Sequence, residues 1–236
     1  MICVTGNTHG DIKRFNHSAL RKLRKGDTLI ICGDFGFLWT GKKAEKHKLK
    51  WIGKRRYNVL FVDGCHENFD LLEEYELEQW KGGKTRKLYG RLRQLMRGEV
   101  YDIDGKIVFA FGGGHSDDMD MRKPGETWWV AERPTEEQIE QGFKNLQTVD
   151  NRVDFVVTHE PPEKIHEMLN MDMDSQSLTC AFLGEVNKIV TFKQWFFGKL
   201  HLNKRISPQF CSVFNNVIMA DPARYKRDKS GNIKIK

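Results

Sequence analysis

The sequence predicts an α/β domain built on a mixed sheet or on paired sheets. Short apolar runs that are typical of buried strands alternate with helical apolar stripes in both halves of the chain. Such alternation favours one α/β domain over two separate folds. No internal repeat, linker or low-complexity block divides the chain, so we expect one domain over 1–223 and a basic tail over 224–236.

Five of these apolar runs end in clusters of polar residues. The runs cover 1–4, 29–32, 59–62, 155–158 and 195–197. The polar residues that follow them include Asn7, His9, Asp34, Cys65, His66, Glu67, His159, Glu160, Lys199 and His201. Because the carboxyl ends of parallel strands meet at one edge of a sheet, we expect these clusters to converge there.

Helical patterns connect the strands. We expect helices over 12–24 with Asp11 as N-cap, 42–56, 68–75, 135–146 with Thr135 as N-cap, 164–169 and 178–190, with a polar loop over 171–176. The residues of 42–56 are mostly basic, which predicts an exposed helix beside the site with solvated charges.

The remaining segments predict further strands and loops. Residues 99–111 predict a hairpin that turns at Asp104 and Gly105, and 210–214 and 217–220 predict a final strand pair. The basic stretch within 80–98 is either a surface hairpin with solvated charges or a contact for a phosphate backbone. His115, Asp117 and Asp118 follow a glycine-rich loop and are expected at the rim of the site, or as solvated loop residues. The tail is expected to be disordered or a late edge strand.

The length of the chain allows a large buried core, and the cysteine pattern indicates reduced thiols rather than disulfides. A chain of 236 residues can bury roughly 70–75% of the surface that its unfolded form exposes, so no disulfide or metal is needed for stability. The five cysteines are widely spaced, which predicts buried thiols in the strands. Cys65 is the exception, because it lies in a loop beside His66.

The charge and hydropathy limit the partners. A net charge of +7 makes phosphate-bearing partners plausible, nucleic acid among them, although such basicity also serves solubility. Lys13 and Arg14 interrupt the first apolar stretch, and no run approaches the ~18 apolar residues of a membrane span. We therefore expect a cytoplasmic protein with no membrane contact. The sequence does not define an oligomeric state.

The convergent side chains are suited to binding metal ions. His9, Asp34, His66, His159 and His201 offer nitrogen and oxygen donors of the kind that Mn²⁺, Fe²⁺ or Zn²⁺ bind. Two such ions bridged by one carboxylate can activate a water and neutralise charge that develops on phosphorus. Asp34 is the expected bridge.

The order of these motifs resembles that of the calcineurin-like metallophosphoesterases. The match consists of Asn7-x-His9, Gly33-Asp34, Gly64-Cys65-His66-Glu67, Thr158-His159 and Gly198-Lys199-Leu200-His201. The segments 96–98, 111–114 and 116–122 resemble a bacterial and phage branch of that superfamily. The resemblance implies a four-layer α/β/β/α sandwich that hydrolyses a phosphomonoester or phosphodiester by metal-activated water.

Three positions depart from the family pattern. The resemblance assigns a first ion to Asn7, His9, Asp34 and His201, where the family has Asp in place of Asn7. It assigns a second ion to Asp34, Cys65, His159 and Lys199, where the family has Asn in place of Cys65 and His in place of Lys199. A protonated ammonium cannot coordinate a metal, so we expect one divalent ion, Mn, Fe or Zn, rather than two.

Other family roles also carry over by position. His66 matches the family's general acid, and Arg122, Lys199 and His115 are candidates for binding phosphate. Lys199 could stand in for the second ion by pairing with Asp34 and a substrate phosphate. The alternative is a catalytically impaired relative that acts as a phosphate-, nucleic-acid- or protein-binding module.

Overall fold

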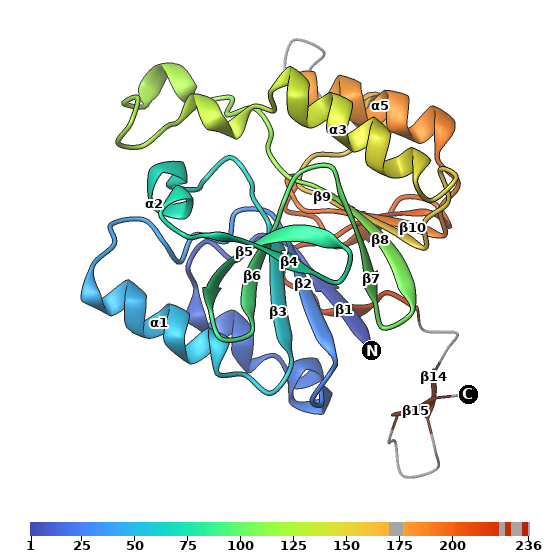
Figure 1. Cartoon of the computed structure of the whole chain (residues 1–236), viewed down its shortest axis with the longest axis horizontal. Coiled ribbons are helices and arrows are strands. Elements are labelled where there is room, and N and C mark those ends of the chain that lie inside the picture. The colour runs from blue at the N-terminus through green and yellow to red at the C-terminus, as the bar shows by residue number, and fades with distance from the viewer. Residues whose placement is uncertain (170–176, 222–224, 228–232, 236) are drawn as a thin grey trace.

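The computed structural model describes residues 1–169, 177–221, 225–227 and 233–235, and these form a mixed α/β fold with two large mixed sheets (Figure 1). The first sheet has the order β13-β1-β2-β3-β6-β5-β4, and β1, β2, β3 and β6 are parallel. Its strands are β1 (Ile2–Thr5), β2 (Thr28–Cys32), β3 (Asn58–Val62), β4 (Leu77–Trp80), β5 (Gly83–Tyr89), β6 (Leu92–Leu95) and β13 (Ile218–Met219).

The second sheet repeats this plan with a parallel centre and antiparallel edges. Its order is β11-β12-β10-β9-β8-β7, with β8, β9, β10 and β12 parallel. Its strands are β7 (Glu99–Ile103), β8 (Lys106–Phe111), β9 (Phe155–Thr158), β10 (Gln194–Phe197), β11 (Lys204–Arg205) and β12 (Phe210–Ser212). The five apolar runs of the sequence are therefore confirmed as β1, β2, β3, β9 and β10.

A shared apolar core joins the two sheets. Alternate residues of β1, β2 and β3, such as Val4, Ile30 and Leu60, pack with Ala110 of β8 and Val157 of β9 in one buried cluster. Residues of opposite parity on the same strands face the other way, as expected for a pleated strand buried on both faces. This common core fixes the carboxyl ends of β1 to β3 next to those of β8 to β10.

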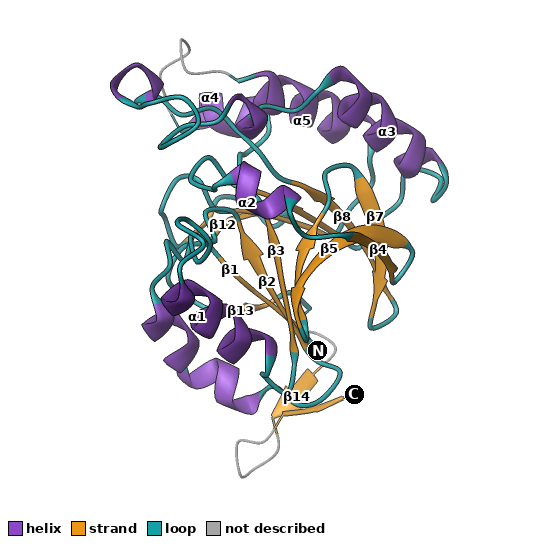
Figure 2. Cartoon of the chain, turned by 60° about the vertical axis from the view of Figure 1, so that its left-hand side comes forward, coloured by secondary structure: helices purple, strands orange, loops and turns teal. Residues whose placement is uncertain are grey.

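Helices cover the outer faces of the sheets (Figures 1 and 2). Helix α1 (Lys43–Gly53) and the 3₁₀ helices η1 (Ile12–Asn16) and η2 (Ser18–Lys22) pack on the first sheet, whereas α3 (Glu136–Gln147) and α5 (Leu178–Ile189) pack side by side on the second. The shorter elements are α2 (Phe69–Glu73), α4 (Glu163–Met168), η3 (Met119–Met121) and η4 (Val130–Glu132). No helix among the described residues is long and apolar enough to cross a membrane.

The helix expected over 12–24 is wrong in type and continuity. The segment forms η1 and η2, which meet at His17, whose extended backbone and side chain cap the second of them. Phe15, Leu20 and Leu23 still supply the buried apolar contacts that produced the helical pattern. The other five helices are confirmed as α1 to α5, with bounds shifted by a few residues, and the loop expected over 171–176 lies outside the described residues.

The basic stretch within 80–98 forms the predicted hairpin, in which Lys81, Lys84, Lys87 and Arg91 are exposed whereas Arg93 and Arg97 are buried. It forms the β5–β6 hairpin, but every residue of β6 is buried because this strand pairs with β3 inside the sheet. Arg93 Nε donates to Glu78 at 2.6 Å, and Arg97 Nε donates to Asp63 at 2.9 Å. These two arginines are thus neutralised within the fold.

The chain ends in short strand pairs. The hairpin over 99–111 is confirmed as β7 and β8, and the pair expected over 210–214 and 217–220 is reduced to β12 and β13, which belong to different sheets. Within the tail, β14 (Tyr225–Arg227) and β15 (Ile233–Ile235) pair only with each other among the described residues. Figure 1 shows them apart from both large sheets.

Candidate metal and anion site

The loops that follow six parallel strands converge on one site. They come after β1, β2 and β3 of the first sheet and after β8, β9 and β10 of the second. Residues of the loops after β2, β3, β8, β9 and β10 line a pocket of about 230 Å³, and His9 of the β1 loop contacts two of its lining residues, Asp34 and His201. Its lining is Asp34, Cys65, His66, His115, Ser116, Asp117, Asp118, His159, Lys199 and His201. His115, Asp117 and Asp118 therefore lie at this pocket.

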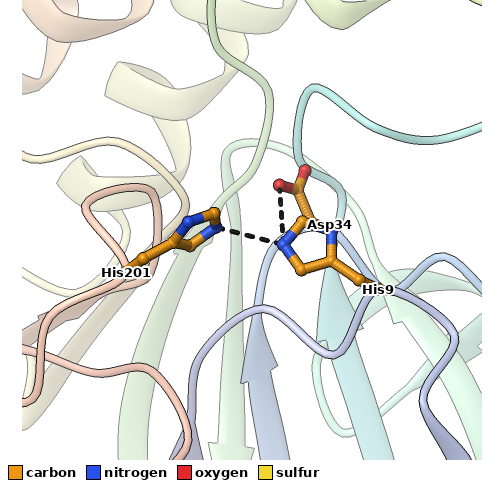
Figure 3. Close-up of side chains that lie close together, drawn as sticks. All are labelled: His9, Asp34 and His201. Atoms are coloured by element: carbon orange, nitrogen blue, oxygen red, sulfur yellow. Dashed lines mark hydrogen bonds and ion pairs between the residues drawn. The ribbon is translucent and has the colours of Figure 1, made fainter.

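Three side chains form the centre of the site (Figure 3). His9 Nε2 lies 3.0 Å from His201 Nε2, although 192 positions separate the two residues in sequence. The same His9 nitrogen lies 3.9 Å from Asp34 Oδ2, and the three donor atoms all lie within 4.8 Å of one another. Within the described part of the chain, this is the single group of three or more histidine, cysteine or acidic residues with that spacing.

All three central residues have left-handed backbone conformations. The φ angles are 45° at His9, 44° at Asp34 and 52° at His201, in a region that non-glycine residues rarely adopt. Backbone hydrogen bonds hold the first two in place, because the amides of Thr8 and His9 both donate to the Asp34 carbonyl. Strained backbone of this kind persists where the surrounding structure enforces it, and it clusters at functional sites.

Two glycines permit the close approach of the loops. A Cβ atom at Gly64 would lie 2.1 Å from Asp34 Oδ1, and one at Gly198 would lie 2.4 Å from Asn7 Oδ1. Any side chain at either position would displace the central carboxylate or the amide beside it. The glycine in each of these two motifs is therefore a packing requirement of the site.

The Asn7 amide faces the centre with its nitrogen. Its Nδ2 donates to Asp34 Oδ2 at 3.0 Å and lies 2.8 Å from His201 Nε2. Its Oδ1 is buried and has no hydrogen-bond partner. A half-turn of the amide plane would aim this oxygen at the centre, so Asn7 reaches the expected ligand position but presents a donor there.

The central carboxylate is kept ionised by its neighbours. Burial has the largest single effect and raises the pKa of Asp34, but His159, His66 and the His66 backbone N–H together outweigh it, and the net pKa lies below the ordinary value. That backbone amide donates to Asp34 Oδ1 at 2.9 Å. Burial also lowers the pKa of His9, which leaves its imidazole neutral at pH 7. An ionised carboxylate and a neutral imidazole are the protonation states that bind metal.

The donor set of the centre fits one divalent metal ion. Tetrahedral ligands about 2.05 Å from an ion are separated by roughly 3.3 Å. The distances from His9 Nε2 to His201 Nε2 and to Asp34 Oδ2 are 3.0 Å and 3.9 Å, which bracket that value. The unpartnered Asn7 oxygen would be a fourth donor after rotation of its amide.

The donor set expected for a second ion does not fit. His159 is well placed, because its Nε2 lies 3.6 Å from Asp34 Oδ1 while Nδ1 faces the Cys32 carbonyl. Burial, however, raises the pKa of the Cys65 thiol well above its ordinary value, so a metal would have to displace the thiol proton in order to bind the sulfur. The loop position of Cys65 thus does not make it exposed or reactive; all five cysteines are free and buried.

Lys199 occupies the space beside Cys65 as one half of an ion pair. Its Nζ donates to Glu160 Oε1 at 2.8 Å and to the His115 carbonyl, so the expected pairing with Asp34 is wrong. Burial is the largest effect and lowers the pKa of Lys199, but the charge of Glu160 and its hydrogen bond to the ammonium raise it, and the net pKa lies above its usual range. The ammonium is therefore a permanent cation where the resemblance places a second metal.

Glu160 is the residue whose role sequence reasoning missed. It is buried and also accepts from the His115 amide at 2.9 Å and from the Ser177 hydroxyl, so three segments depend on it. The available signal was the lysine at position 199, because a buried ammonium requires a nearby carboxylate. Glu67 likewise supports the site from behind, accepting from the amides of Phe35 and Gly36.

His66 and Arg122 face each other at the pocket wall. An Arg122 Nη atom lies 2.7 Å from His66 Nδ1, and a second Nη donates to Asp118 at 2.8 Å. Burial lowers the pKa of His66 and is the largest effect, and the positive charge of Arg122 lowers it as well. The negative charge of Asp34 raises the pKa by less, so the net pKa lies below 6.5. His115 lines the same pocket, and its Nδ1 lies 3.4 Å from Arg133 Nη2. Lys199 therefore lines the pocket, whereas Arg122 lies behind its lining residues His66 and Asp118.

Comparison with known proteins adds no assignment. No family model matches the sequence, and no curated protein matches it.

Proposed function

We propose that the protein is a metal-dependent phosphoesterase of the calcineurin-like type, with one bound divalent ion. The observation that carries this proposal is the cluster of His9, Asp34 and His201, in which three unrelated loops hold donor atoms at metal-ligand spacing in strained backbone. As part of the proposal, the two sheets and their covering helices constitute the four-layer α/β/β/α sandwich of that class.

In this proposal His9, Asp34 and His201 hold Mn²⁺, Fe²⁺ or Zn²⁺, and Asn7 contributes its oxygen after rotation of its amide. Such an ion supplies a Lewis acid for a phosphoryl oxygen and lowers the pKa of a water. The chain's own residues then orient the substrate. His159 and the His66 amide keep Asp34 ionised, so the negative charge needed to retain a cation is present at neutral pH.

Lys199 and Arg122 bind the phosphate group in this scheme. Both are cationic, Lys199 lines the pocket and Arg122 contacts its lining residue His66, and an arginine can bind two phosphoryl oxygens at once. Lys199 supplies the second positive charge that a two-metal site would supply by an ion. His66 is neutral near pH 7, so only its protonated fraction can donate a proton to the leaving oxygen.

A second candidate function is phosphate binding without turnover. Three observations favour it: the Asn7 nitrogen faces the centre, Cys65 is a neutral thiol, and Glu160 already neutralises Lys199. A protein of this kind would use the same pocket to hold a phosphorylated ligand. The two functions differ in whether product forms.

The decisive experiment combines metal analysis with a hydrolysis assay. The purified chain is loaded with Mn²⁺ or Zn²⁺, the bound metal is measured by elemental analysis, and hydrolysis of p-nitrophenyl phosphate and bis-p-nitrophenyl phosphate is followed. We expect about one ion per chain and metal-dependent release of nitrophenol that His9→Ala abolishes. A chain that binds metal but releases no product from either compound would support the binding module and overturn the esterase.

A further inference from the structure

A strongly basic surface is formed by helix α1 and the turn after it, residues 42–56, called here the α1 surface. It contains eight lysines and arginines and one glutamate. None of the eight lies within 4 Å of a carboxylate in the described part of the chain. Glu45 does not compensate, because its carboxylate accepts from the amides of Trp39, Thr40 and Gly41. The positive charge of this surface is thus not neutralised within the fold.

A cavity at the end of this helix gathers four of the chain's basic side chains. It has a volume of about 390 Å³ and is lined by Arg21 of η2 and by Lys54, Arg55 and Arg56, with the rings of Phe15 and Tyr57. No acidic side chain lines it. It lies at the C-terminal end of α1, where β2 and β3 begin, which is the end of the sheet opposite to the metal and anion site.

Arg55 and Trp51 form a stacked pair at this cavity. The guanidinium carbon of Arg55 lies 3.4 Å from the centre of the Trp51 ring, and Phe15 contacts the indole edge-on. Arg55 Nε is buried and has no hydrogen-bond partner, while the Trp51 side chain is 41% exposed. A buried cationic donor without an acceptor is costly, and an anion in the cavity would satisfy it.

The lysines of α1 extend this anion site along the helix. Lys43, His47, Lys50 and Lys54 follow one another at helical spacing on one exposed face. The row is about 16 Å long, which exceeds the reach of a single phosphate group. A ligand that matched the row and the aromatic side chain would carry several phosphates and a flat ring.

We propose that the α1 surface binds a single-stranded nucleic acid, with backbone phosphates along the lysine row and at the cavity and a base stacked on Trp51. Single-strand sites combine a positively charged track with aromatic side chains in this way. This proposal places the nucleic-acid contact on the α1 surface and not on the basic stretch within 80–98, where Arg93 and Arg97 pair with acidic side chains of the fold. It is independent of the proposed esterase activity, because its residues lie outside the metal and anion site.

The test is fluorescence anisotropy with a labelled oligodeoxythymidylate of about 20 nucleotides, in EDTA so that no metal-dependent cleavage occurs. Binding is measured over a series of salt concentrations for wild type and two triple variants. The first variant is Lys43→Gln, Lys50→Gln and Lys54→Gln. The matched control is Lys123→Gln, Lys144→Gln and Lys188→Gln, which removes the same charge from exposed lysines that have acidic neighbours. Circular dichroism confirms that both variants are folded.

We expect the first variant to bind the oligonucleotide at least tenfold more weakly. The slope of log affinity against log salt concentration should become less steep by about 2. The affinity of the control variant should change much less. Trp51→Leu should weaken binding by roughly tenfold through lost stacking, with little change in salt slope. Three results would overturn the proposal: no binding by wild type at low salt, equal losses in both triple variants, or tighter binding of a duplex of the same length than of the single strand.

Discussion

Lys199 and Glu160 form an ion pair of 2.8 Å beside the pocket that contains Asp34 and His201. The lysine side chain is 18% exposed and the glutamate 4%, so each is largely removed from water. The pair places a fixed cation next to Cys65 and His159, where the second metal would be held by the family pattern. The ammonium thus occupies that position, and its charge is balanced by Glu160.

Removal of one partner of this pair should be more harmful than removal of both. Lys199→Met leaves the Glu160 carboxylate buried and unpaired, and we expect a loss of about 2–4 kcal/mol in the free energy of unfolding. Lys199→Met with Glu160→Gln should recover at least half of that loss, because no uncompensated charge is left. Urea denaturation of the wild type, both single variants and the double variant measures the coupling. If the loss of unfolding free energy in the double variant equalled the sum of the losses in the two single variants, the ion pair would have no coupling energy.

Metal affinity should depend on the donor atoms of His9 and His201, and a carboxylate in place of the Asn7 amide should increase it. We expect His201→Ala to weaken Zn²⁺ or Mn²⁺ binding by at least tenfold, since it removes one of three donors. Asn7→Asp should strengthen binding by roughly tenfold or more, because a carboxylate adds charge and cannot present an N–H to the centre. Isothermal titration with each metal measures both effects, and His47→Ala, an exposed histidine on α1, is the control. Unchanged affinity in His201→Ala would contradict the assignment of the site.

Stability should fall in acid in part through Glu45. Burial, the largest effect, raises the pKa of Glu45, but hydrogen bonds from the amides of Trp39, Thr40 and Gly41 together outweigh it, and the net pKa lies below 4.5. A lowered carboxylate pKa means that the stabilisation is complete above pH 4.5 and is lost as the pH falls through the folded-state value. We expect Glu45→Gln to lower the free energy of unfolding by about 1 kcal/mol at pH 7. Below pH 4 the free energies of unfolding of the variant and the wild type should become more similar. Thermal denaturation from pH 3 to pH 7 measures this, with Glu140→Gln as the exposed control. A difference that stays constant over this range would refute it.

The thiols should be unreactive in the folded state. All five cysteines are buried, and burial raises the pKa of Cys65 well above its ordinary value, as it does for Cys32. Because the thiolate is the reactive form, we expect reaction with Ellman's reagent at pH 8 to be at least 100-fold slower than in urea. Cys65→Ser should leave the native rate unchanged. Rapid labelling of one thiol per native chain that Cys65→Ser removes would show that Cys65 is accessible.

Much of the fold follows from local patterns. Runs such as Leu29 to Cys32 are too apolar to be exposed and too short for a helix, so they could only be buried strands, and the parallel pairing of β1, β2 and β3 brings their loops together. For this reason the pattern of the first sheet groups His9 with Asp34, whereas His201 follows β10 and is brought to them by the packing of the second sheet on the first. The continuity of the segment after Asp11 could not be predicted, because the same apolar contacts serve an α-helix or two 3₁₀ turns.

The sequence by itself determined the strand order along the chain, the convergence of polar loops and the identity of the donor atoms at the centre. Tertiary structure alone decided their partners: Lys199 pairs with Glu160, Arg97 with Asp63, and Asn7 turns its nitrogen inward. The physical reason is that strand and helix patterns depend on neighbours within a few residues. A buried charge or amide, in contrast, takes whichever partner the packing of distant segments brings within hydrogen-bond distance.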